Sequence, residues 1–243
     1  MPYSDTHRYI HIRVPKTASS SVTKSLRLAH REQGGVFVHT KGKVDAEFKE
    51  KYNLKCLDMT NAAQIQHLSA REMKHIMGNK YDEYFSFSFV RNPWALVVSN
   101  YNYSHISNKP SPGKIKEIIE KKGYPPLRKF HDKPFDVWLE EHVPKLKAIH
   151  GKTSFGLKLG CNQLAKLCDI NGEIIVDFVG HLESIDRDLP YIFSKIGLTL
   201  DKVRHRNRST FKSYTDYYNH KTRAIVAELY ALDIERFGYE FTS

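Results

Sequence analysis

Apolar residues recur along the chain with two different periods. Apolar runs at residues 9–14, 36–39, 85–90 and 173–179 predict β-strands. Between them the spacing is helical, as at Val22, Leu26 and Ala29, which stand at i, i+4 and i+7. Strands that alternate with helices indicate an α/β protein of three layers, in which helices cover a mostly parallel central sheet. A length of 243 residues suits a single domain, 1–243.

Two further helices have recognisable ends. Ser69 and Glu72 have the spacing of a capping box, so we expect a helix from this point to Gly78. Apolar residues with helical spacing over 219–237 predict another helix, and Gly238 stands where it would end.

One segment, residues 105–134, breaks the alternation. It carries five prolines, and eight Lys or Arg against three acidic residues. We expect a basic, irregular excursion around a short helix near 115–121. It is either a solvated loop or a lid on the acceptor side, because long loops in compact domains often serve function.

Composition is that of a soluble globular protein, with 40% hydrophobic and 27% charged residues. The chain has no long apolar run and no signal-peptide core at its start, so we expect no integral membrane segment and a cytoplasmic protein. Cys56, Cys161 and Cys168 lack metal-like spacing, which favours free thiols.

The formal net charge of +11 indicates a surface that attracts anions. Nucleic acid, acidic glycans, nucleotide phosphates and anionic membranes are all compatible with it, as is a basic protein with no polyanionic partner.

The first strand leads into a turn rich in donors. Pro15 ends the strand, so residues 16–21 lie between it and a helix, whose first N–H groups lack intrahelical partners. A lysine and four hydroxyls at such a turn predict a phosphate site: Lys16, Thr17, Ser19, Ser20 and Ser21. One serine acting as the N-cap would explain one hydroxyl, but not four and a lysine.

This turn does not fit a Walker A motif, because the glycines of G-x-x-x-x-G-K-[ST] are missing. Nor does an acidic residue end a strand where it would hold Mg²⁺, since Asp177 lies within the strand expected at 173–179. A nucleotide phosphate bound without a metal-centred hydrolysis site is therefore favoured over an ATPase, and no metal site is predicted.

A second turn follows the strand at 85–90. Asn92 suits a helix N-cap and Pro93 a first helical turn, which places Arg91 at the carboxyl end of the strand, where ligands bind in open α/β sheets. Arg91 can clamp a phosphate bidentately, and Ser99, about two turns into the helix, can hydrogen-bond it. Taken alone, Arg91 would equally suit a surface ion pair.

Together, PKTASSS at 15–21 and FVRNPWALVVSNY at 89–101 resemble the two cofactor motifs of sulfotransferases that use 3′-phosphoadenosine-5′-phosphosulfate (PAPS), especially their carbohydrate and heparan-sulfate-type branch. The resemblance continues at 67–78, 175–198 and 230–241. It implies a P-loop NTPase-like sulfotransferase fold and the transfer of a sulfuryl group from PAPS, which leaves PAP and requires no metal. Ser19 stands where relatives often have glycine, and a serine there would stiffen the turn.

The resemblance also assigns cofactor contacts. The first turn would surround the 5′-phosphosulfate through Lys16, Thr17, Ala18, Ser19, Ser20 and Ser21, and the second would hold the 3′-phosphate through Arg91 and Ser99. A basic, hydroxyl-rich loop near the C-terminus closes over the cofactor in the family. Its match here lies at 205–212, with Arg208, Ser209 and Thr210 as candidate contacts, although a basic surface turn remains an alternative.

Sulfuryl transfer is an in-line displacement that needs a base near the acceptor hydroxyl. We predict His67, because relatives carry a histidine shortly before the R-N-P strand and because positive potential at a helix start would keep the ring neutral. Lys16 would stabilise charge on the bridging oxygen of the leaving 5′-phosphate. Rival bases are His11, His39, His105 and, more weakly, Glu183, for which we favour a structural role.

The leading hypothesis is thus a PAPS-dependent sulfotransferase acting on a carbohydrate or other hydroxyl-bearing acceptor, possibly an acidic one. Tyr101, Tyr103 and His105 would line the acceptor side, unless they only pack. Two alternatives stay open: a nucleotide kinase of related fold, and a module that binds polyanions or nucleic acid. The missing Walker glycines argue against the kinase, and no nucleic-acid motif appears, so we expect no nucleic-acid partner.

Overall fold

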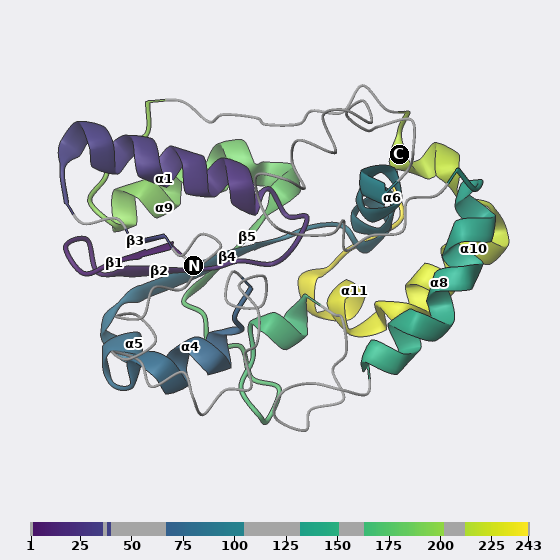
Figure 1. Cartoon of the computed structure of the whole chain (residues 1–243), viewed down its shortest axis with the longest axis horizontal. Coiled ribbons are helices and arrows are strands. Elements are labelled where there is room, and N and C mark those ends of the chain that lie inside the picture. The colour runs from purple at the N-terminus through teal and green to yellow at the C-terminus, as the bar shows by residue number, and fades with distance from the viewer. Residues whose placement is uncertain are drawn as a thin grey trace, which may run out of the picture.

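The computed structural model describes residues 2–35, 38–39, 67–104, 132–150, 163–201 and 212–242. Here five strands form one sheet in the order β3-β1-β2-β4-β5 (Figure 1). Their bounds are β1 Pro2–Ser4, β2 Tyr9–Ile12, β3 Val38–His39, β4 Phe85–Val90 and β5 Phe178–His181.

The centre of the sheet is parallel and its margin is antiparallel. β2 pairs with β4, and β4 with β5, in parallel. β1 pairs antiparallel with both β2 and β3. Residues 5–8 join β1 to β2, too short a link for the crossover that a parallel pair needs. The prediction of a mostly parallel sheet is therefore wrong at this margin, where the apolar pattern also missed the three residues of β1.

Helices cover both faces of the sheet and give the α/β layering (Figure 1). On one face lie α1 (Ser19–Gln33) and α9 (Ile185–Lys195), which pack on the buried rings of Tyr9 and Phe87. On the other lie α4 (Ala70–Met77) and α5 (Lys80–Glu83), which pack on Ile10 and Ile12. Because neighbouring residues of a strand point to opposite faces, β2 contributes to both cores and is buried along its length.

The strand expected at 173–179 lies later in the chain, at Phe178–His181. Asp177 precedes β5, and its Oδ2 accepts hydrogen bonds from the N–H (2.7 Å) and hydroxyl (2.6 Å) of Ser86. A side chain, not a strand ladder, thus joins this segment to the start of β4. Asp177 lies at the amino edge of the sheet, away from the carboxyl edge where a Mg²⁺-binding acid would stand.

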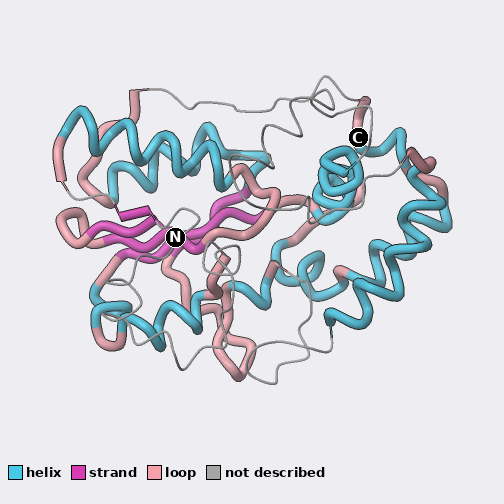
Figure 2. The backbone as a smooth tube through the Cα atoms, in the orientation of Figure 1, coloured by secondary structure: helices cyan, strands magenta, loops and turns pink. Residues whose placement is uncertain are grey.

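The remaining helices gather beyond the carboxyl ends of the parallel strands (Figures 1 and 2). They are α6 (Pro93–Ser104), α8 (Phe135–His150), α10 (His220–Leu229) and α11 (Ala231–Phe237), with the 3₁₀ turn η5 (Tyr214–Tyr217). The helix predicted at 219–237 is divided at Tyr230. α10 packs on α6 and α8, whereas α11 contacts the 3₁₀ turn at Leu164–Lys166. Gly238, with φ 64°, ends α11 as predicted.

The capping box before α4 is confirmed. Glu72 Oε2 accepts the Ser69 N–H at 2.6 Å, and Ser69 Oγ accepts the Glu72 N–H at 3.3 Å. Of the excursion at 105–134, residues 105–131 lie outside the described part of the chain, as do Cys56 and Cys161; Cys168 is a buried free thiol. None of the helices described is both long and apolar enough to cross a membrane.

Candidate functional site

The two turns singled out by the sequence meet at the carboxyl edge of the sheet. β2 and β4 are neighbours in register, with Ile12 opposite Ser88, so the turns that follow them emerge side by side. Arg91 Nη1 donates a hydrogen bond to the Lys16 carbonyl oxygen at 3.4 Å. The structure therefore brings the two motifs together, 75 residues apart in the chain.

The first turn has an unusual backbone. Lys16 (φ 68°) and Ala18 (φ 57°) adopt left-handed conformations, which cost free energy in residues other than glycine. Ala18 is the N-cap of α1 and has no side-chain capping bond. The alternative that a serine caps this helix is therefore wrong. Ser19, at the position where relatives often have glycine, is the first helical residue and is not left-handed.

The hydroxyls of the first turn are not equivalent. Thr17 Oγ1 donates to the Val14 carbonyl at 2.9 Å, so its proton is used inside the turn. Ser19 and Ser21 are buried, whereas Ser20 is exposed. The N–H groups of Ser19 and Ser20, at the first two helical positions, have no acceptor within the helix. Of the four hydroxyl-bearing residues, only Ser20 is exposed, and the helix start adds N–H groups beside it.

The Lys16 side chain extends to α6, the helix that begins within the second motif. Its Nζ lies 4.2 Å from the centroid of the Tyr103 ring, a cation–π contact. Tyr103, near the end of α6, is 59% exposed. Tyr101 instead is buried, and its hydroxyl donates to the Lys133 carbonyl at 2.9 Å. Of the aromatic residues expected on the acceptor side, Tyr103 borders Lys16, Tyr101 packs in the core, and His105 lies outside the described residues.

The second turn is capped by its own side chain. Asn92 Oδ1 accepts the Trp94 N–H (3.1 Å), as predicted for an N-cap, and Asn92 Nδ2 donates to the Glu240 carbonyl (2.8 Å). Glu183 Oε1 in turn accepts the Asn92 N–H at 2.8 Å. Since Glu183 holds the backbone of this turn, its geometry supports the structural role that we favoured for it.

Arg91 is half-buried, and both of its backbone polar groups are bonded to one side chain. Gln163 Oε1 accepts the Arg91 N–H at 2.8 Å, and Gln163 Nε2 donates to the Arg91 carbonyl at 2.7 Å. Burial lowers the pKa of the Arg91 guanidinium, while Glu183 and Tyr239 nearby act in the opposite direction. Arg91 remains a cation at neutral pH. Ser99 is half-buried in α6, the helix that follows the turn of Arg91.

His67 lies beside the strand that leads into the first turn. Its Nδ1 is 3.2 Å from the Arg13 carbonyl oxygen, which can only accept, so the neutral ring carries its proton on Nδ1 and leaves Nε2 unprotonated. The pKa of His67 is lowered to about 4, chiefly by burial. The charges of Arg13 and Lys166 lower it further, against the Arg13 hydrogen bond. The ring is neutral at pH 7, as expected, and burial is the main cause.

The rival histidines are placed differently. His11 is 1% exposed within β2 and stacks on Phe87, with ring centroids 4.8 Å apart. An acceptor hydroxyl would therefore not reach it. His39 is in β3, where its side chain is not described, and the residues of the C-terminal loop (Arg208, Ser209, Thr210) lie outside the described residues.

Three residues that we did not predict hold these groups in place. Gln163 is the N-cap of the 3₁₀ turn η3 (Leu164–Lys166), and Lys166 Nζ donates to the His67 carbonyl at 2.9 Å. Asp233 of α11 accepts the N–H groups of Gln163 and Leu164, both at 2.9 Å. Burial raises the pKa of Asp233 to about 6, against its hydrogen bonds to Leu164 and Gln163. No local pattern marks these residues.

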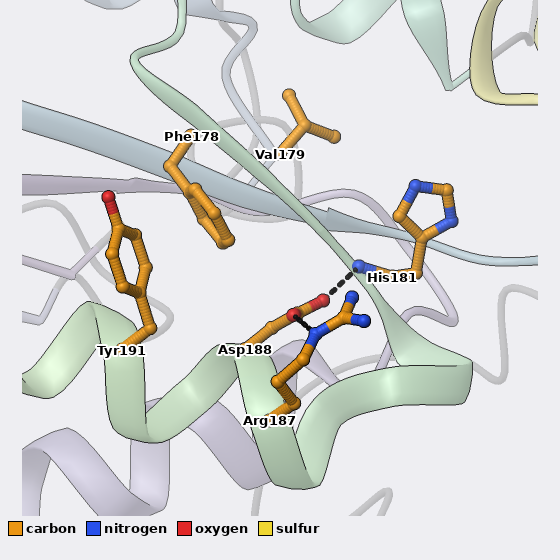
Figure 3. Close-up of a pocket in the computed structure, with 6 residues that line it drawn as sticks. All are labelled: Phe178, Val179, His181, Arg187, Asp188 and Tyr191. Carbon is orange, nitrogen blue, oxygen red and sulfur yellow. Dashed lines mark hydrogen bonds and ion pairs between the residues drawn. The ribbon is translucent and has the colours of Figure 1, made fainter.

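A cavity of about 310 Å³ lies beside β5 and α9 (Figure 3). Its lining consists of Phe178, Val179, His181, Arg187, Asp188 and Tyr191, none of which is a predicted site residue. The Asp188 carboxylate accepts the His181 N–H (2.9 Å) and the Arg187 Nε–H (2.8 Å), as Figure 3 shows. The Asp188 oxygens thus stabilise the start of α9, which is a structural role.

Comparison with known proteins identifies the family to which the chain belongs. Carbohydrate sulfotransferase 14 of Danio rerio is 25% identical over 97% of this chain, and the match covers 61% of that protein's length. An uncharacterized protein of Archaeoglobus fulgidus is 29% identical over 52% of this chain and 79% of its own length. No solved structure matches the chain significantly. The profile described as "Sulfotransferase family" matches residues 1–240. The chain belongs to the sulfotransferase family.

Proposed function

We propose that the protein transfers the sulfuryl group of PAPS to a hydroxyl of a carbohydrate acceptor, with His67 as the base. The observation that carries the proposal is the start of α1, which has no side-chain cap and lies beside the guanidinium of Arg91. A helix start with unused N–H groups attracts an anion, and two neighbouring turns with separate cations suit the two phosphate groups of PAP.

The residues present fit this cofactor. Ser19 and Ser20 offer N–H groups to the 5′-phosphate, Lys16 adds a charge, and Arg91 with Ser99 would take the 3′-phosphate. The strand-turn-helix from β2 to α1 supports the P-loop-like arrangement that the resemblance implies. Arg208, Ser209 and Thr210 stay predictions.

When bound, PAPS supplies a sulfuryl group on a phosphate leaving group. His67 Nε2 would accept the proton that the acceptor hydroxyl loses as its oxygen bonds to sulfur. Arg13 holds the opposite side of the ring through the Nδ1–H bond, which also fixes the tautomer. Lys16 would stabilise the negative charge that gathers on the 5′-phosphate oxygen as its bond to sulfur breaks.

Two observations besides the site itself support a carbohydrate acceptor. The Danio rerio relative is named a carbohydrate sulfotransferase, and the net charge of +11 suits an acidic glycan. Labelled PAPS offered with neutral glycans, acidic glycans, small alcohols and amines should transfer label to a glycan hydroxyl. Transfer confined to amines or small alcohols would overturn this part of the proposal.

Cofactor binding is tested by thermal unfolding with PAP. At a hundredfold excess over Kd, PAP should stabilise the folded protein by about 3 kcal/mol. ATP with Mg²⁺ and duplex DNA are the comparison ligands, for the kinase and the polyanion-binding alternatives. No stabilisation by PAP, or a larger one by ATP with Mg²⁺, would contradict the proposal.

A further inference from the structure

We propose that η3 is a positioning bridge that holds Arg91 and His67 in one fixed relation, so that the 3′-phosphate clamp and the base stay aligned. The η3 bridge is defined as residues 163–166 together with their anchor, Asp233. The inference rests on the proposed function, since it assigns these residues to the same site.

One end of the bridge holds the second turn. The Gln163 side chain forms a reciprocal pair of hydrogen bonds with the N–H and carbonyl of Arg91, at 2.8 and 2.7 Å. Gln163 is 2% exposed, so water cannot readily replace a lost partner. The backbone from which the Arg91 guanidinium extends is therefore fixed by a single amide side chain.

The other end holds the base. Lys166 Nζ donates to the His67 carbonyl at 2.9 Å, which ties the backbone of His67 to the same 3₁₀ turn. The positive charge beside the ring also opposes its protonation. Lys166 thus acts on both the location and the protonation of His67 without touching a reacting atom.

The bridge has one buried anchor. Asp233 is fully buried and receives the N–H groups of Gln163 and Leu164 on its two carboxylate oxygens. Asp233, far away in the sequence, therefore anchors the start of η3, and the Gln163 carbonyl oxygen accepts the Lys166 N–H at 3.0 Å, which links this start to the other end. A change at Asp233 should disturb both ends, whereas a change at Gln163 or Lys166 should disturb one.

The base end is tested by the pKa of the His67 ring, followed by NMR without cofactor. Lys166→Met should raise this pKa above about 4 and lower kcat by about tenfold, with little change in PAP affinity. Lys166→Arg, which keeps charge and donor, should keep the pKa low. Lys74→Met is the matched control, because Lys74 pairs with Asp82 and does not contact His67.

The clamp end is tested by the Kd for PAP, measured by calorimetry. Gln163→Leu should weaken PAP binding by about tenfold and leave the His67 pKa unchanged. Gln33→Leu is the matched control, since Gln33 makes the same reciprocal pair of bonds with the backbone of Thr199. If Gln163→Leu does not fold, Gln163→Glu keeps the acceptor for the Arg91 N–H, loses the donor, and should still weaken PAP binding.

Asp233→Asn tests both ends at once, because the amide has one acceptor oxygen whereas the two N–H groups are bonded to the two different carboxylate oxygens. The Kd for PAP and the His67 pKa should then change together. An unchanged His67 pKa in Lys166→Met, or an unchanged Kd in folded Gln163→Leu, would overturn the bridge. If the unaltered protein fails to bind PAP, the proposed function fails, while the His67 titration still tests the bridge.

Discussion

The two turns at the carboxyl edge of the sheet follow neighbouring strands and precede helices, yet they are built in opposite ways. The turn before α6 is capped by Asn92 and held by Glu183 and Gln163. The turn before α1 has Ala18 at its N-cap and no side-chain cap. It also contains two residues with positive φ that are not glycine.

This difference indicates that the second turn is stabilised by the protein itself, whereas the first turn is suited to bind a ligand. Side chains of the protein form hydrogen bonds with the backbone of the second turn, so this turn is a rigid support for the guanidinium of Arg91. The first turn lacks such a cap and accepts backbone strain, which suits a turn whose N–H groups are completed by a ligand. The chemistry should therefore depend on the first turn and the folding stability on the second.

The largest effect is expected from His67, beside the first turn. His67→Ala should lower the rate of transfer by about 10²–10⁴-fold and leave PAP affinity unchanged, because in the proposed mechanism the ring takes a proton and does not hold the cofactor. His75→Ala, an exposed histidine of α4, is the control. Loss of PAP affinity in His67→Ala would instead mean that His67 is structural.

His67 also sets a pH dependence. Only the neutral ring can accept a proton, and its pKa is about 4, so the rate should lose this contribution as pH falls through about 4. The lowered pKa also means that the folded state resists protonation of His67. Its contribution to stability is present above the ordinary histidine pKa and is lost as pH falls towards 4. A pH–rate profile with a His67-dependent limb near pH 6.5 would contradict this assignment.

Lys16 should have the next largest effect. Lys16→Met should reduce transfer by about 10²–10³-fold, because an electrostatic contact to the leaving group strengthens in the transition state. The melting temperature should fall by no more than about 4 °C, since the cation–π contact to exposed Tyr103 contributes about 0.5–1 kcal/mol. Lys24→Met, further along α1, controls for the lost charge. A rate equal to that of this control would exclude Lys16 from the transfer step.

At the second turn the expected effect is on stability. Asn92→Ala removes the cap of α6 and the bond to the Glu240 carbonyl, and should lower the free energy of unfolding by about 1–2 kcal/mol. Urea unfolding measures this, with Asn219→Ala, which removes the cap of α10, as the comparison. An Asn92→Ala protein as stable as the original would remove the contrast between the turns.

The smallest effect is expected at Ala18. Glycine relieves the strain of φ 57° but loosens the unfolded chain, so Ala18→Gly should change the free energy of unfolding by less than about 0.5 kcal/mol. Ala29→Gly, at a buried helical position of α1, should cost about 1 kcal/mol or more. Equal losses at the two positions would show that the first turn is not strained.

Local signals in the sequence predicted the local elements well. The strand, turn and helix around Lys16, the capping box at Ser69 and the cap at Asn92 all depend on residues a few positions apart. The antiparallel margin was not predicted because β1 is too short to show a period. The strand near 173–179 was predicted too early because the apolar residues before Asp177 pack in the core and form only an isolated bridge.

The residues that surround the candidate site could not be predicted from local sequence patterns. The low pKa of His67 comes from burial and from charges on Arg13 and Lys166, which no sequence window contains together. Gln163 contacts Arg91 across 72 residues, and Asp233 contacts Gln163 across 70. Such contacts depend on tertiary packing, so the sequence predicted candidate groups but not what holds and tunes them.

The contrast between the turns is tested most directly by the backbone amides themselves. In the ¹⁵N-labelled protein titrated with PAP, the amide resonances of Ser19 and Ser20 should shift strongly. Those of Trp94 and Ala95, whose N–H groups face the Asn92 cap, should stay nearly fixed. Shifts at Trp94 and Ala95 with none at Ser19 and Ser20 would contradict the assignment of the first turn as the phosphate site.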